Sequence, residues 1–308
     1  MTTLNAVSSS PIDFGAVSPM REMGAYEWLW SQDSERTKPS FKAVADLFRQ
    51  NPGALPSDLV SERDAMSCAK QVLERFGRCG VNSFGVRVFG VGDYQQSLRD
   101  AENPLELLYY QGEWDLAYSP KRVAIVGTRN PSDEGVRRTK KLVSLLVKDG
   151  YTIVSGLAKG VDRVAHETAI DQGGETIAVI GTPLDHAYPK ENADLQRRIA
   201  REFLLISQVP VLLYARRSWQ WNRLFFPERN VTMSALTQAT IIVEAGETSG
   251  TLIQARAALA QGRKLFILES NFHRPDLTWP HRFAEKGAIR VRDFDDIRVQ
   301  LDDEAPDN

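Results

Sequence analysis

Cysteine and histidine are scarce in this sequence, whose 308 residues include two cysteines and four histidines. Cys68 and Cys79 stand eleven positions apart, and neither belongs to a CxxC pair or has a matching pair of histidines. The scarcity excludes a disulfide framework, and the spacing argues against a zinc site. We therefore expect two reduced thiols, no bound metal and no other cofactor.

Long apolar runs are missing as well. No stretch approaches the roughly 20 apolar residues that a membrane-spanning helix needs. The first residues also lack the basic-then-apolar pattern of a secretory signal. Because 42% of the residues are hydrophobic and 25% are charged, the composition is that of an ordinary globular protein. We expect a cytoplasmic protein without a membrane partner.

The formal net charge of -2 conceals a strong segregation of charge along the chain. Residues 121–150 hold eight basic residues against three acidic ones, and residues 197–231 hold seven against two. Residues 293–308 form an acidic tail, with seven acidic residues opposed by Arg298 alone. Local basic regions of this kind favour an anionic partner, whatever the overall charge.

The first third of the chain differs in texture from the rest. Residues 1–19, rich in Ser, Thr and Pro, are predicted to be a flexible arm. Apolar residues then recur at helical spacing, as with Tyr26, Leu29 and Trp30, and predict a helical module of three or four helices over residues 20–85. The residues of this module indicate no chemistry.

Residues 86–292 read as alternating strands and helices. This alternation predicts right-handed crossovers and an α/β fold, a doubly wound, mostly parallel sheet with helices on both faces. The predicted strands are 86–89, 122–126, 151–154, 176–180, 204–206, 239–243, 264–268 and 288–291. The predicted helices are 133–148, 160–172, 191–203, 229–237 and 250–260, with a short one opening at Asn103.

Three of the strands end abruptly at small residues and pass into a helical pattern, at residues 123–129, 153–162 and 241–251. The carboxyl ends of parallel strands meet at one edge of a sheet, so these turns would line that edge with backbone N–H groups. Such an edge indicates a phosphate-containing ligand, either a nucleotide or a nucleic acid backbone. The candidate binding residues in the turns are Gly127, Arg129, Ser155, Gly156, Lys159, Gly160, Ser249, Gly250 and Thr251.

Arg129 follows a strand and a glycine, so its guanidinium should project over the ligand edge, where it can bind a phosphate or stack on a base. The alternative is a salt bridge to Asp133 or Glu134. In the next turn we expect Asp162 to order its loop. We expect His166, one helical turn later, to make a local hydrogen bond to it rather than act in catalysis.

Residues 216–230 mix cations with aromatic rings. That mixture suits a single nucleic acid strand, because cations hold phosphates and rings stack on bases. Aromatic residues in such loops also serve as lid or core residues, and composition alone does not decide between the two. The additional candidates from composition are Arg216, Arg217, Trp219, Trp221 and Arg223.

Taken in order, these motifs resemble those of the DprA/Smf family of DNA-processing proteins, whose core is an extended Rossmann-like fold related to the LOG phosphoribohydrolases. The resemblance spans about residues 86–292 and adds Phe226, Arg229 and Asn230 to the expected DNA contacts. The segments that carry it are 93–98, 127–129, 155–162, 165–166, 173–178, 188–189, 226–230, 244–245, 249–253 and 262–263.

The resemblance implies a non-catalytic protein that binds single-stranded DNA in a basic pocket, forms a homodimer and can hand the strand to the RecA recombinase. Our candidate dimer contact is the late strand at residues 263–268, as an edge strand that pairs with its own copy. The chain departs from the family pattern at three places: Val231 replaces a basic residue, Gln208 replaces an acidic one, and Glu269 with Ser270 replaces a Pro-Gly pair.

Two other functions stay open. In LOG-like nucleotide hydrolases a catalytic glutamate follows a Gly-Thr pair by three residues, but here that position is Gln254, whose amide cannot act as a carboxylate acid or base. Glu244 can equally organise the loop after its strand, so we assign no catalytic residue. The other candidate is a regulatory or antitoxin partner in a phage-defence or toxin–antitoxin module, which the helical N-terminus and the acidic tail allow.

Overall fold

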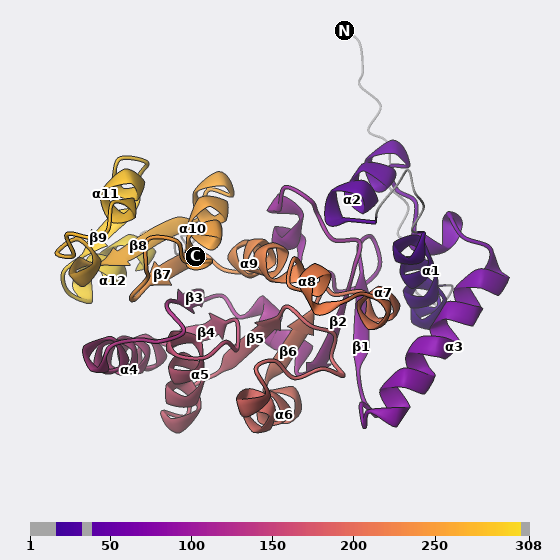
Figure 1. Ribbon diagram of the computed structural model, residues 1–308, viewed down its shortest axis with the longest axis horizontal. Coiled ribbons are helices and arrows are strands. Elements are labelled where there is room, and N and C mark those ends of the chain that lie inside the picture. The colour runs from indigo at the N-terminus through magenta and orange to yellow at the C-terminus, as the bar shows by residue number, and fades with distance from the viewer. Residues whose placement is uncertain (1–16, 33–38, 303–308) are drawn as a thin grey trace, which may run out of the picture.

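The computed structural model describes residues 17–32 and 39–302 (Figure 1). Most of the predicted arm and the last residues of the acidic tail lie outside these ranges. The strands are β1 Gly85–Val88, β2 Leu107–Gly112, β3 Arg122–Val126, β4 Thr152–Ser155, β5 Thr176–Ile180, β6 Leu204–Ser207, β7 Ala239–Ile242, β8 Lys264–Leu268 and β9 Ile289–Val291. The α-helices are α1 Pro19–Ser31, α2 Phe41–Gln50, α3 Glu62–Arg78, α4 Asp133–Lys148, α5 Val161–Asp171, α6 Ala193–Glu202, α7 Val211–Arg216, α8 Trp219–Asn222, α9 Phe225–Ala235, α10 Thr251–Ala260, α11 Trp279–Ala284 and α12 Asp295–Asp302.

The strands form one nine-stranded sheet in the order β1-β2-β6-β5-β4-β3-β7-β8-β9. From β6 to β9 every neighbouring pair is parallel, whereas β1–β2 and β2–β6 are antiparallel. The chain winds outward from β3 in one direction to β6, then returns to place β7 on the other side of β3. The predicted doubly wound, Rossmann-like α/β fold is therefore confirmed.

Alternate side chains of each central strand enter cores on opposite faces of the sheet, as strand geometry requires. Val123 and Ile125 of β3 pack with α4 and α5. Ala124 and Val126 of the same strand pack in the cluster that includes residues of α9, α10 and α11. In Figure 1 these two groups of helices lie below and above the sheet. The sheet is covered on both faces, which explains its nearly continuous apolar strands.

The predicted short helix at Asn103 is wrong, and β2 was missed. Residues 107–112 form a strand that pairs antiparallel with both β1 and β6. Leu107 and Tyr109 enter one core while Leu108 enters the other, so this apolar run is buried on both sides. Such a run lacks the alternation that would identify a strand, and tertiary pairing decides its structure.

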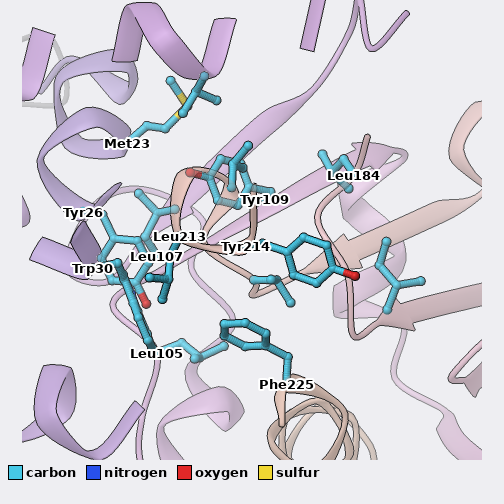
Figure 2. Close-up of a cluster of buried hydrophobic side chains, with 14 of the residues drawn as sticks. Met23, Tyr26, Trp30, Leu105, Leu107, Tyr109, Leu184, Leu213, Tyr214 and Phe225 are labelled. Carbon is cyan, nitrogen blue, oxygen red and sulfur yellow. The ribbon is translucent and has the colours of Figure 1, made fainter. Parts of the chain in front are cut away.

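The N-terminal helices share a core with the sheet. Tyr26 and Trp30 of α1 pack in one cluster with Leu107 and Tyr109 of β2 and with Phe225 at the start of α9, as Figure 2 shows. Helix α1 begins at Pro19, where the Ser18 hydroxyl accepts the backbone N–H of Arg21. The prediction of helices in this part of the chain agrees with α1, α2 and α3.

The C-terminal part of the described chain adds one element to the sequence prediction and corrects another. The acidic segment forms helix α12, whose Ile297 and Leu301 are buried in the same cluster as β3. Strand β8 lies between β7 and β9 and pairs in parallel with both. The proposed dimer contact through an exposed edge at residues 263–268 is therefore wrong, because this strand is internal to the sheet.

Candidate nucleic-acid interface

A cavity of about 700 Å³ opens where β3 and β7, neighbours in the sheet, end. This is the point at which the strand order reverses direction, and crevices at such points are where open α/β sheets bind ligands. The cavity is lined by residues 126–129 at the end of β3 and in the turn after it, by the start of α10 and the loop before it, and by α8 and α9. Predicted site residues that line it are Gly127, Arg129, Trp219, Arg223, Phe226, Arg229, Asn230, Ser249, Gly250 and Thr251.

Arg129 is exposed at the cavity, as predicted from its place after β3. The alternative salt bridge to Glu134 does not form, because Arg137 and Arg138 pair with that carboxylate. Within the described residues the Arg129 guanidinium has no ion-pair partner. It is therefore available for a phosphate or a base.

The turn after β3 requires glycine for packing. A Cβ atom at Gly127 would come within 2.6 Å of Val161 Cγ2 and 2.8 Å of the Glu244 carbonyl oxygen. The Gly127 carbonyl accepts a hydrogen bond of 3.3 Å from Thr251 Oγ1, which joins this turn to the start of α10. Ser249 Oγ accepts the backbone N–H of Thr251 at 3.2 Å. The positive end of the α10 dipole thus lies at the cavity.

Three rings form an aromatic wall, which we define as Tyr188, Trp219 and Phe226. The ring centroid of Tyr188 lies 4.7 Å from that of Trp219 and 5.4 Å from that of Phe226. The ring centroids of Trp219 and Phe226 lie 5.9 Å apart. Trp219 is 45% exposed, so part of its ring can receive a stacked base. Gly181 lets Phe226 approach, since a Cβ there would lie 2.5 Å from the ring.

Tyr188 was not predicted as a site residue. It lies in the loop after β5, far in sequence from the other two rings. The only signal was its place in the Tyr-Pro pair that contributes to the family resemblance. Nothing in the local pattern indicates that this loop would reach α8 and α9.

Arg229 was predicted to contact DNA, but in the structure it has a different role. Its side chain lines the cavity but is 5% exposed, and Nη1 donates to the carbonyl oxygens of Val179, at 2.7 Å, and Gly156. Burial lowers the pKa of Arg229, while the nearby Asp162 carboxylate opposes that effect. Burial likewise raises the pKa of Asp162. Because its guanidinium donates to these two carbonyls, Arg229 joins β5 to the turn after β4 and is not available to contact DNA. Asn230, beside it, donates from Nδ2 to the Gly250 carbonyl at 3.2 Å.

The turn after β4 lies largely outside the cavity lining, contrary to prediction. Ser155 is buried, and its Oγ donates to the Ile125 carbonyl at 2.7 Å. Gly156 contacts Arg229, and Gly160 adopts a positive φ of 72° beside the Thr128 carbonyl. Lys159 forms an ion pair of 2.5 Å with Glu191. Among the lining residues, this turn contributes Ala158 and Asp162.

The five candidates from composition divide into two groups. Trp219 and Arg223 line the cavity, whereas Arg216, Arg217 and Trp221 do not. The Arg217 guanidinium lies 5.9 Å from the Trp221 ring centroid. Among the departures from the family pattern, Gln208 is buried, and none of Gln208, Val231 and the Glu269-Ser270 pair lines the cavity.

The carboxylate and imidazole groups near the cavity have structural partners. Glu244 accepts from Ser132 Oγ at 2.8 Å and from the Ser132 backbone N–H, so it organises the start of α4. Gln254, which lines the cavity, donates to Thr240 Oγ1 at 3.2 Å. The expected bond between His166 and Asp162 is wrong, because His166 Nδ1 lies 2.7 Å from Thr176 Oγ1.

The part of the chain that the structure describes contains no group of three or more His, Cys, Asp or Glu residues placed to hold a metal ion. No helix in the same residues is both long and apolar enough to cross a membrane.

Comparison with known proteins places this chain in a family. The sequence model of the family described as "DNA recombination-mediator protein A" matches residues 86–302. The chain is 41% identical to Protein Smf of Synechocystis over 192 residues, which are 61% of this chain and 46% of that protein. It is 32% identical to DNA processing protein DprA of Bacillus subtilis over 231 residues, 75% of each chain.

Two solved structures are similar. DNA processing protein A of Streptococcus pneumoniae superposes with a TM-score of 0.63 at 28% identity, covering 92% of this chain and 94% of that one. The protein of the same name from Helicobacter pylori gives a TM-score of 0.59 at 29% identity, covering 72% and 97%; its structure concerns the single-stranded DNA binding mode of that protein. The chain therefore belongs to the family of DNA recombination-mediator protein A, the DprA/Smf family of DNA-processing proteins.

Proposed function

We propose that this chain binds single-stranded DNA in the cavity at the ends of β3 and β7, and that it does so without catalysis. One observation carries the proposal: the aromatic wall and the unpaired Arg129 line the same cavity. A mononucleotide needs one stacking surface and one phosphate contact. Three rings beside two exposed arginines suit a ligand with repeating bases and phosphates.

The geometry assigns phosphate binding and base stacking to different side chains. Arg129 and Arg223 are exposed cations at the cavity, so they provide the phosphate contacts. The start of α10 adds backbone N–H groups and the positive end of a helix dipole. Trp219 and Phe226 offer faces to bases. Affinity should therefore have a salt-dependent part from phosphates and a smaller, salt-independent part from stacking.

The absence of catalysis is also a proposal, and two side chains support it. Gln254 stands where a LOG-like hydrolase would place its glutamate, and a side-chain amide is too weak an acid and too weak a base to serve in general acid–base catalysis. Glu244 already accepts hydrogen bonds from Ser132. Neither group is placed as a general acid or base.

The test is a titration with a single-stranded oligonucleotide, the matching duplex and a nucleoside monophosphate. We expect the single strand to bind most tightly, with log affinity falling against log salt by about 0.7 per neutralised phosphate. The nucleoside monophosphate should be recovered intact. Tighter binding of the monophosphate, with release of a free base, would instead establish the hydrolase function.

Dimer formation, transfer of the strand to RecA and the regulatory or antitoxin role stay predictions from the family resemblance. Sedimentation at micromolar concentration tests the first, since a monomer alone would contradict it. The neighbouring genes separate the other two: a recombination gene favours RecA, and a toxin-like gene favours the antitoxin role.

A further inference from the structure

The segment that carries much of the aromatic wall is held at its start by the first helix of the chain. Glu27 of α1 is fully buried, and its carboxylate accepts three hydrogen bonds. Oε1 accepts from Tyr109 Oη at 2.5 Å and from the backbone N–H of Val211 at 2.7 Å. Oε2 accepts the Leu212 backbone N–H at 2.9 Å. Glu27 therefore binds the otherwise uncapped N-terminus of α7.

The same segment is held at its end by aromatic packing. Phe225, the residue before Phe226, lies with its ring centroid 5.9 Å from that of Phe41 in α2 and 6.4 Å from that of Trp30 in α1. Figure 2 shows Trp30 and Phe225 near one another in this core. Because Phe225 and Phe226 are consecutive, the position of one ring restricts the position of the other.

Three cavity residues, Trp219, Arg223 and Leu224, lie between these anchors. Trp219 and Arg223 belong to the short stretch from α8 to α9. The buried Asn222 ties this stretch back to α7, donating to the Tyr214 carbonyl at 2.9 Å. A displacement of α7 is therefore transmitted to the residues that line the cavity.

The third ring of the wall is also connected to the N-terminal helices. Asp185, in the loop that leads to Tyr188, has a fully buried side chain and forms an ion pair of 2.6 Å with Arg75 of α3. Helices α1, α2 and α3 thus each contact a segment that carries a ring of the aromatic wall.

We propose that the N-terminal helices set the geometry of the aromatic wall, with Glu27 as the main positioning residue. This inference rests on the proposed function, and it assigns to α1–α3 a part chiefly in recognising bases, since two of the three rings of the wall lie in the segment they hold. A core built for stability alone gains little from a buried carboxylate, since an apolar residue of similar volume is often as good. Three donors aimed at Glu27 instead specify where α7 begins.

The experiment compares Glu27→Gln with the parent and with a matched control, Glu106→Gln. Glu106 is also buried, pairs with Arg99 at 2.8 Å and does not line the cavity. Each protein is titrated with an oligonucleotide and with the same strand carrying abasic sites. The ratio of the two affinities measures base recognition, independently of the phosphate contacts.

We expect the parent to prefer intact bases by about tenfold, within the range that stacking contributes. In Glu27→Gln this ratio should fall close to one, while the affinity for the abasic strand, which still meets Arg129 and the start of α10, should fall much less than the affinity for the intact strand. Glu106→Gln should keep the parent ratio. A folded Glu27→Gln protein that keeps the full preference for bases overturns the inference.

Hydrogen exchange supplies a measurement that does not depend on DNA. The amides of residues 221–223 bond within this stretch, and we expect them to exchange about tenfold faster in Glu27→Gln. Faster exchange confined to Val211 and Leu212 would contradict the inference. A parent protein that binds neither strand would refute the proposed function. The exchange rates would still test whether Glu27 sets the position of the segment that carries Trp219. Should Glu27→Gln not fold, Phe41→Leu loosens the second anchor, and the same results are expected.

Discussion

At the scale of single residues, Arg129 gives a direct test of the phosphate contacts. Its guanidinium has no ion-pair partner in the described parts of the chain, so Arg129→Ala should leave the free energy of unfolding nearly unchanged. We expect the affinity for a single-stranded oligonucleotide to fall roughly tenfold, because one charge-assisted contact is lost. The slope of log affinity against log salt should also decrease in magnitude by about 0.7. Fluorescence anisotropy at several salt concentrations measures both.

Lys159 is the informative control for this variant. It was predicted as a phosphate contact, but it pairs with Glu191 and lies outside the cavity lining. Lys159→Ala should therefore change the affinity much less than Arg129→Ala. Equal losses in the two variants would show that the bound strand follows the turn after β4 instead.

In contrast to Arg129, Arg229 should contribute mainly to the free energy of unfolding. Arg229→Met removes the buried donor to the Val179 and Gly156 carbonyls and takes away the stronger of the two cations that act on the buried Asp162 carboxylate. We expect the free energy of unfolding to fall by about 3–5 kcal/mol, as when one member of a buried charge pair is removed. Urea denaturation measures it. A variant as stable as the parent but unable to bind DNA would make Arg229 a direct contact after all.

These residues show where prediction from sequence succeeds. Arg129 follows a strand and a glycine, and that local arrangement already determines where its side chain projects. For Arg229 the same chain position predicts a contact, but the burial that changes its role depends on strands 50 and more residues away. Tyr188 and Glu27 act through partners distant in sequence, so no local pattern could reveal them.

At the scale of elements, Glu244 joins the end of β7 to the start of α4. Glu244→Ala leaves the Ser132 backbone N–H and hydroxyl without their acceptor, and Ser132 is the N-cap of that helix. We expect a loss of about 1 kcal/mol in the free energy of unfolding, typical of a weakened cap. Urea denaturation beside Glu285→Ala, at an exposed position, is the measurement. A loss no larger than in the control would refute the structural role.

The elements themselves were predicted unevenly. The sequence predicted β3, β5 and β8 with their observed bounds, because these buried strands are short, largely apolar runs bounded by turn residues. It missed β2, which has an equally apolar run but owes its strand structure to antiparallel partners at the sheet edge. The short helices α7, α8 and α11 were missed as well, since one or two turns carry little periodicity.

At the scale of the whole molecule, His166 should make stability depend on pH. Its ring is fully buried, and burial lowers its pKa from 6.5 to about 3. Below pH 6.5 the imidazole of His166 therefore binds a proton in the unfolded chain but not in the native state, so the free energy of unfolding decreases as the pH falls. Between pH 7 and pH 5 we expect the free energy of unfolding to decrease by about 2 kcal/mol from this group.

The comparison of His166→Gln with the parent isolates this contribution. Buried carboxylates such as Asp162 have raised pKa values and act in the opposite direction, but they are common to both proteins. Urea denaturation at each pH should show a difference between the two proteins that narrows as the pH falls. A constant difference would mean that His166 titrates normally in the folded state.

The helical module at residues 20–85 and the α/β region that begins at residue 86 should unfold together. The N-terminal helices and the sheet share one core, in which Trp30, Tyr109 and Phe225 come from different parts of the chain. We expect a single thermal transition in which the calorimetric enthalpy equals the van't Hoff enthalpy. Two resolved transitions in calorimetry would show that the helical module unfolds separately.

The bond between Glu27 and Leu212 spans 185 residues, and this separation bears on how the protein is made. At synthesis rates of about 5–20 residues per second, α1 leaves the ribosome roughly 10 to 40 s before its partner exists. During that interval the apolar face of Tyr26 and Trp30 can be covered in part by Phe41 of α2 and by Leu107 and Tyr109 of β2, but it still lacks α7 and Phe225. Nascent chains of this protein should therefore depend on chaperones until α7 emerges, and slow closure of so long a loop should limit the rate of folding.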